Sequence, residues 1–152
     1  MGRIAGIARH DRPLGPMEVL DSAELVEGQG VDGDFRGTRK AGSQGQNGVV
    51  LIEASDWAAA TEECGAAVPW FERRANLLVE GLDLPKQAGA RLWIGDSVLV
   101  EITQECAPCE RMEALHPRLR AALTPDWRAG ARARVLSGGI VAVGDEIKAE
   151  GE

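Results

Sequence analysis

The chain has little of what disulfide frameworks and zinc sites are built from. Its 152 residues include three cysteines, two histidines and no tyrosine. An odd, small number of cysteines argues against a disulfide framework, and free thiols are typical of a reducing compartment, so we expect a cytoplasmic protein. Because His10 and His116 are the only histidines, a four-ligand zinc site at Cys106 and Cys109 would also need Cys64 or a carboxylate.

Excess positive charge and long apolar runs are also missing. Seventeen Lys and Arg residues face 24 Asp and Glu residues, which leaves a formal net charge of -7. A general nucleic-acid binder needs a basic face that releases counterions, so this charge balance excludes that class. No apolar run approaches the ~20 residues of a membrane span, and the N-terminal residues are too polar for a signal peptide. We therefore expect neither nucleic acid nor a membrane as a partner.

What the chain does have is glycine, placed between short apolar runs. Nineteen glycines scattered in this way predict β structure with many turns, and the length predicts one domain over residues 1–152. The continuous run at residues 49–52 predicts a strand buried on both faces. The predicted strands cover residues 3–8, 23–27, 49–52, 77–79, 92–94, 97–103 and 133–137.

Two Gly-Asp pairs each separate a short apolar run from a new strand. Gly95-Asp96 and Gly144-Asp145 are predicted to form tight corners, because glycine permits positive φ and aspartate bonds to nearby backbone. Two such corners suit a curved or closed sheet. Ser137-Gly138-Gly139 is predicted to be a hairpin turn. Residues 28–48 read as a long loop, of a length that is usually functional or mobile.

Helical spacing is found in two places. Residues 55–64 predict a helix that is capped by Ser55 and ended by Gly65. Trp57 and Cys64 lie on one stripe of this helix, which indicates that Cys64 is a packed core thiol. A second short helix is predicted over residues 117–123, closed by Pro125.

The other two cysteines lie where a strand gives way to a turn. Pro108 breaks the strand that ends near Thr103 and is suited to start a short helix. A thiol at a helix start feels the positive end of the helix dipole, which favours the thiolate that attacks sulfur donors or binds a soft metal. Arg111 would stabilise a thiolate at Cys109, whereas the glutamates on either side would oppose it, so the balance stays open.

A cluster of arginines precedes the apolar run at residues 77–79. The planar fork of arginine meets a phosphate group with two hydrogen bonds. Adjacent strand residues point to opposite faces, so only one of Arg73 and Arg74 can face a site. We predict that it is Arg74, on the same face as Asn76, and that Arg73 is a solvated surface charge. Arg36 and Arg39, in the long loop, are either site residues or ordinary loop charges.

Taken in order, these segments resemble a stand-alone MOSC domain, the module named for the C-terminal part of molybdenum cofactor sulfurases. The resemblance is carried by GVDGDFRG at residues 30–37, RANLLVEGLDL at 74–84, Gly95-Asp96, Pro108-Cys109, LSGG at 136–139 and VGD at 143–145. It implies a mainly β fold, a closed or partly closed β-barrel with a few short helices. It also implies molybdenum cofactor handling or sulfur transfer.

The resemblance also implies site residues and partners. Cys109 would be the sulfur acceptor or the molybdenum ligand, and the candidate cofactor-binding residues are Arg36, Arg39, Arg74, Asn76 and Arg111. A cysteine desulfurase or other sulfur donor, a molybdoenzyme or an electron-donor protein would be the partner. Some relatives reduce N-hydroxylated compounds. Because no aminotransferase-like domain precedes this one, we expect no pyridoxal phosphate site in this chain.

Two other kinds of function remain open from the residues alone. The spacing Cys106-x-x-Cys109 also suits a redox dithiol. A binding module without chemistry, docking on a molybdoenzyme or sensing the cofactor, is compatible with the acidic surface.

Overall fold

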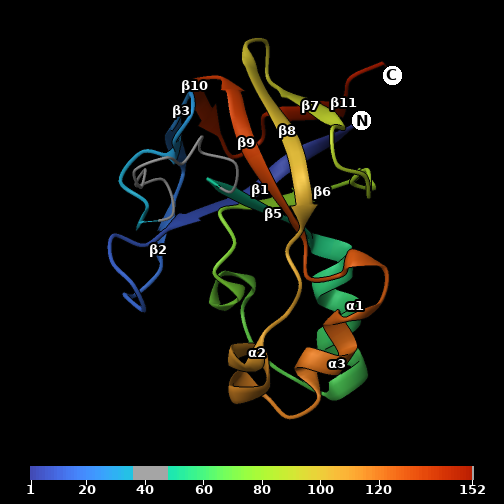
Figure 1. Ribbon diagram of the computed structural model, residues 1–152. Coiled ribbons are helices and arrows are strands. Elements are labelled where there is room, and N and C mark those ends of the chain that lie inside the picture. Colours follow the sequence, from blue (N-terminus) through green and yellow to red (C-terminus); the bar gives the residue numbers. More distant parts are fainter. Residues whose placement is uncertain (36–47, 152) are drawn as a thin grey trace.

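The computed structural model describes residues 1–35 and 48–151, and within these ranges seven strands close into a barrel (Figure 1). The strands follow the order β11-β7-β8-β9-β5-β6-β1, and pairing of β1 with β11 closes the ring. Neighbours are antiparallel except for the parallel pair β5–β6, and β2 pairs with β1 outside the ring. The bounds are β1 Gly2–Arg9, β2 Glu18–Leu20, β5 Val49–Glu53, β6 Leu77–Glu80, β7 Arg91–Ile94, β8 Val98–Glu105, β9 Ala131–Ser137 and β11 Glu146–Ala149. The predicted barrel is therefore confirmed.

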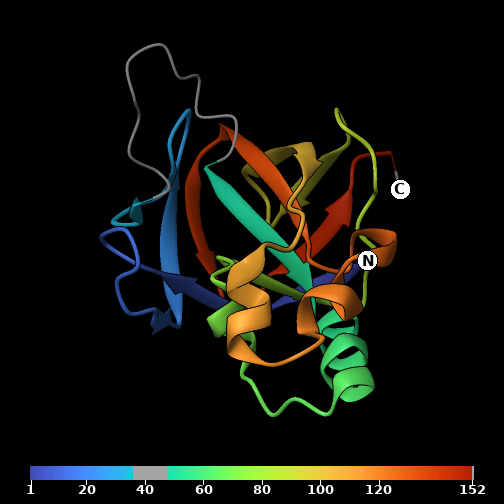
Figure 2. The same cartoon turned by 60° about the horizontal axis from the view of Figure 1, so that its bottom comes forward.

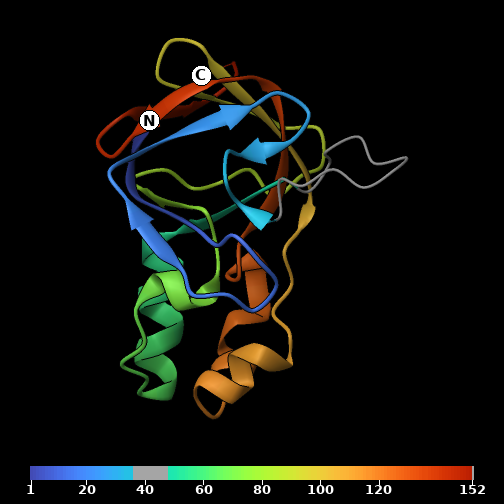
Figure 3. The same cartoon turned by 90° about the vertical axis from the view of Figure 1, so that its left-hand side faces the viewer.

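A second, three-stranded sheet lies beside the barrel, in the order β10-β3-β4 (Figure 3). Its strands are β3 Ser22–Val26, β4 Gly30–Val31 and β10 Gly139–Ala142. The predicted hairpin at residues 137–139 is wrong, because β9 and β10 belong to different sheets. Gly138 lies so close to Leu25 that an added Cβ would be 2.5 Å from the Leu25 carbonyl oxygen. Residues 137–139 therefore carry the chain from the barrel to the second sheet.

The two Gly-Asp pairs form turns, as predicted. Gly95 has φ +61° in the β7–β8 hairpin, where Ile94 pairs with Val98. Gly144 has φ +98°, and the carboxylate of Asp145 accepts a hydrogen bond from the Ala142 amide at 2.8 Å. Positive φ costs an L side chain steric energy that glycine avoids, which is why these turns reverse the chain in so few residues.

The helices gather at one end of the barrel (Figures 1 and 2). They are α1 Ala54–Cys64, the 3-10 helix η2 Trp70–Arg73, α2 Glu110–Leu115, α3 Leu119–Leu123 and the short turn η3 Pro125–Trp127. The cap position of α1 is held by Glu53, so the predicted Ser55 cap is wrong, whereas Gly65 ends the helix in the left-handed conformation as predicted. In the described ranges no helix has the length and apolar character needed to cross a bilayer.

Strand β5 divides two hydrophobic cores. Val49 and Leu51 point into the barrel, whereas Val50 and Ile52 point to the helices, and all four are buried. This strand is therefore buried on both faces, as its continuous apolar run predicts. The helix-side core also contains Cys64, Trp57, Ala60, Cys106, Met112, Leu119 and Leu123. Cys64 is thus a packed core thiol, as predicted.

Candidate functional site

A pocket of about 430 Å³ lies where the end of β1, the loop after it and α2 meet. Two guanidinium groups line the pocket, those of Arg74 and Arg111, and no carboxylate is among its lining residues in the described part of the chain. Its other lining residues are His10, Pro13, Leu14 and Phe35. The described lining therefore combines two cationic groups with an apolar wall, on a chain whose net charge is -7.

Arg74 reaches this pocket because of its backbone conformation. It ends η2 with φ +67°, the left-handed region that a non-glycine residue adopts at an energetic cost. Its Nη2 donates a hydrogen bond to the Gly15 carbonyl at 2.6 Å, which fixes the loop after β1. Arg74 is therefore held in place by the fold rather than extended freely into solvent.

Arg74 is a partly buried cation that lies near a second cation. Burial lowers the pKa of its guanidinium, and the positive charge of Arg111 lowers it further. Glu72 and Asp34 act in the opposite direction with a smaller effect. The fold thus holds two like charges close together in partial burial, and this costs free energy. A bound anion would offset part of that cost.

Arg111 and the predicted reactive thiol belong to the same short segment. A thiol lies at a helix start, as the sequence predicts, but α2 begins at Glu110 rather than at Pro108. Cys109 holds the cap position, and Arg111 lies in the first turn. Cys109 is exposed, whereas Arg111 is half-buried and lines the pocket. Cys109 is not one of the described lining residues, although it lies only two residues from one. Because α2 has only six residues, its dipole is much weaker than that of a long helix.

His10 is a pocket residue that the sequence did not single out. The carboxylate of Asp34 accepts a hydrogen bond from the His10 main-chain amide at 2.9 Å, and its Oδ1 lies 3.3 Å from the ring Nδ1. Phe35 N–H donates to the His10 carbonyl at 2.6 Å. These contacts join the end of β1 to the segment at residues 34 and 35. The sequence offers a signal for it, because one of the chain's two histidines lies two residues after the first predicted strand.

Asn76 is completely buried and lies in the wall of the barrel. Its Oδ1 accepts a hydrogen bond from Val50 N–H at 2.9 Å, and its Nδ2 donates to the Ala8 carbonyl at 3.1 Å. The side chain thereby joins β5 and β1 beside β6, two residues after Arg74. Its role as a cofactor ligand stays a prediction. Arg36 and Arg39, the two other predicted arginines, lie outside the described residues.

Arg73 is not the surface charge that the sequence predicted. It is 7% exposed, and its Nε donates to the Ala129 carbonyl at 2.9 Å. Its Nη2 donates to the carbonyl of Cys106 at 2.9 Å and lies 3.1 Å from the same residue's Sγ. The prediction assumed a strand, but η2 followed by the left-handed Arg74 turns the two arginines in different directions.

Cys106 and Cys109 differ in their surroundings. Cys106 is buried in the helix-side core, whereas Cys109 is exposed, and both are free thiols. Over residues 1–35 and 48–151 no group of three or more His, Cys, Asp and Glu side chains is arranged to hold a metal ion. The structure therefore offers no zinc site at this pair in the described residues, and a redox dithiol stays a hypothesis.

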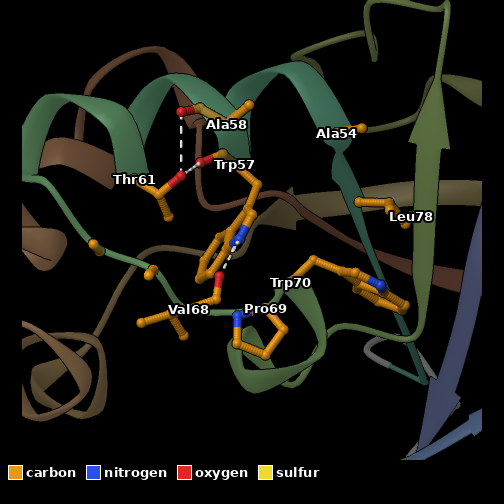
Figure 4. Close-up of a pocket in the computed structure, with 10 residues that line it drawn as sticks. Ala54, Trp57, Ala58, Thr61, Val68, Pro69, Trp70 and Leu78 are labelled. Carbon is orange, nitrogen blue, oxygen red and sulfur yellow. Dashed lines mark hydrogen bonds between the residues drawn. The ribbon is translucent and has the colours of Figure 1, made fainter.

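A second pocket, of about 530 Å³, lies beside α1 and has a different chemistry (Figure 4). Trp57 and Trp70 line it, together with Val68, Pro69, Leu78 and small residues. The indole N–H of Trp57 donates to the Val68 carbonyl at 3.0 Å and is thereby used within the fold. No charged side chain is among the lining residues in the described ranges, so this pocket does not suit an anionic cofactor.

Comparison with known proteins identifies the family. The MOSC domain family matches residues 34–148. The chain belongs to the MOSC domain family. MOSC domains are associated generally with molybdenum cofactor. A comparison with curated proteins found no match.

Solved structures share the MOSC fold of this chain. The YuaD protein from Bacillus subtilis superimposes with a TM-score of 0.80 and 19% identity over 98% of this chain and 96% of that one. YiiM from Geobacillus stearothermophilus gives a TM-score of 0.71 and 16% identity, covering 98% of this chain and 75% of that one. YiiM from Escherichia coli gives 0.67 and 16%, covering 99% and 70%. At these identities the likeness establishes the fold alone.

Proposed function

We propose that this MOSC protein binds molybdenum cofactor in the pocket between Arg74 and Arg111, with Cys109 as the molybdenum ligand or as the sulfur acceptor. The observation that carries the proposal is the pair of guanidinium groups lining one pocket whose described lining residues include no carboxylate. A phosphate-bearing cofactor needs such cations, and arginine is the side chain best shaped to hold phosphate.

The pocket suits the other parts of the cofactor as well. Its volume of about 430 Å³ lies within the range typical of small-molecule sites. Pro13, Leu14 and Phe35 offer an apolar wall for a flat pterin ring, and Leu14 and Phe35 are among the chain's exposed large apolar residues. When bound, the cofactor would supply a redox-active molybdenum centre, and thiolate sulfur is a soft ligand suited to such a metal.

The residues of this chain would bind and orient rather than exchange electrons themselves. Arg74 and Arg111 would hold the phosphate, and the left-handed backbone of Arg74 preorganises that group. Cys109 is exposed and so is open both to a metal centre and to a sulfur donor. As a carrier the protein would take persulfide sulfur from a cysteine desulfurase. As a reductase component for N-hydroxylated compounds it would need an electron-donor protein.

The test is the molybdenum and pterin content of protein purified anaerobically from a host that makes the cofactor. Cys109→Ser is compared with Cys106→Ser, a matched control at the buried thiol. Molybdenum and pterin near one per chain, lost in Cys109→Ser and retained in Cys106→Ser, would support cofactor binding through Cys109. A persulfide on Cys109 without molybdenum would instead support sulfur transfer. Wild-type protein that carries neither the cofactor nor a persulfide on Cys109 would contradict both forms of the proposal.

A further inference from the structure

Arg73 is a buried cation whose partners are unusual. Its three hydrogen bonds go to two main-chain carbonyls and a thiol, and none of the ion pairs among the described residues includes it. Burying a guanidinium costs free energy unless its donors are satisfied. We therefore expect Arg73 to have a role that depends on its hydrogen-bond donors, which a smaller or apolar side chain lacks. Its contacts indicate that role.

The contacts of Arg73 join segments that are far apart in sequence. Ala129 and Cys106 lie 56 and 33 residues away from it. The Cys106 amide also donates to the Gly130 carbonyl at 2.9 Å, so Arg73 closes a small network between the end of β8 and the start of β9. From this network the chain leaves directly toward Cys109 and α2.

Arg74, the next residue, lines the pocket and contacts the loop after β1. It donates to the Gly15 carbonyl at 2.6 Å and lines the pocket with Arg111. The turn at Arg74 sends the two adjacent guanidinium groups to different segments, one to Cys106 and one to Gly15. These two adjacent residues thus link the segment that leads to Cys109 and Arg111 with the loop after β1.

We propose that Arg73 is a positioning residue, which sets the distance between Arg111 and Arg74 by holding the Cys106 carbonyl. This inference rests on the proposed function in one respect, that the pocket binds an anion. Arginine is required because its fork donates to two carbonyls at once, from Nε and Nη2, whereas the single ammonium group of lysine lacks that planar geometry. The thiol of Cys106 is a secondary contact.

The test compares Arg73→Lys, Arg73→Gln and Arg73→Met with wild type, using inorganic phosphate as the probe in calorimetric titrations at low salt. We expect each variant to bind phosphate about tenfold more weakly, because the loss of a contact that orients a ligand-binding residue has an effect of this size. Arg128→Lys is the matched control, because Arg128 also donates to a main-chain carbonyl, that of Ala122, outside the pocket. Cys106→Ala should bind phosphate as wild type does, since the carbonyl contact remains.

Three outcomes would overturn the proposal. Wild-type affinity in folded Arg73→Met, judged by a native near-ultraviolet circular dichroism spectrum, would show that Arg73 serves stability alone. Rescue of affinity by Arg73→Lys would show that its charge matters rather than its geometry. If no variant folds, hydrogen exchange of wild type decides, because phosphate should slow exchange at the Cys106 amide, and an unchanged rate would refute the coupling.

Failure of the proposed function would give a different result. Wild type would then bind no phosphate, yet Arg73→Met would still speed hydrogen exchange at the Cys106 amide and alkylation of Cys109 by iodoacetamide. Unchanged exchange and alkylation in that variant would refute the positioning role independently of what the pocket binds.

Discussion

The stability of this protein should fall between about pH 4.5 and pH 7 because of Glu53. This residue ends β5, precedes α1 and is 6% exposed. Burial raises the pKa of its carboxyl from 4.5 to about 7, with further increases from Asp56 and Asp83. The Leu84 amide donates to its Oε2 at 3.2 Å and opposes the rise without cancelling it.

The change of unfolding free energy with pH follows from the difference in Glu53 proton affinity between the folded and the unfolded state. A raised pKa means that the folded state binds the Glu53 proton more tightly than the unfolded state does. The stabilisation is fully present below the unfolded pKa of 4.5 and is lost as pH rises through the folded value of about 7. The difference between these values corresponds to about 3 kcal/mol of unfolding free energy. Asp56, whose pKa burial also raises, acts with the same sign.

Glu53→Gln isolates the effect, because the amide resembles the protonated carboxyl and keeps an oxygen for the Leu84 amide. The free energy of unfolding of both proteins is measured by urea unfolding at pH 5, 6, 7 and 8, followed by circular dichroism. We expect similar stability at pH 5 and a variant more stable by up to about 3 kcal/mol at pH 8. Glu24→Gln, at an exposed position of β3, is the control for removing one negative charge. A variant less stable than wild type at pH 8 would refute the reasoning.

Two further predictions concern the site and its support. Arg74→Met should weaken phosphate binding at least tenfold, about 1.4 kcal/mol, and reduce the salt dependence of binding. Arg120→Met, on the exposed face of α3, should leave phosphate affinity unchanged. Equal losses of affinity in the two variants, measured by calorimetric titration, would contradict the assigned pocket. Asn76→Ala should lower the free energy of unfolding by about 2–3 kcal/mol, because the Val50 amide and the Ala8 carbonyl lose a buried partner. Urea unfolding measures this change, and a decrease below about 1 kcal/mol would show that water replaces the side chain.

Local chemistry made much of the fold predictable. The apolar runs, the Gly-Asp turns and the glycine that ends α1 each depend on neighbouring residues alone. Both ends of each predicted strand lie within two residues of the ends of an observed strand. The hairpin at residues 137–139 was wrong because strand pairing is a long-range choice. The same tripeptide can reverse a chain or carry it to another sheet, depending on which segment packs against it. In this protein the backbone of Leu25 packs against Gly138.

The family, the barrel and the arginine and cysteine residues that are candidates for the site could all be read from the order of residues along the chain. Which of these residues lie together depends on the folded chain. It brought Arg74 and Arg111 to one pocket, added His10, buried Arg73 and separated the exposed Cys109 from the buried Cys106. The physical reason is that these placements depend on one left-handed residue and on contacts across 33 to 59 residues of chain, which local spacing does not encode.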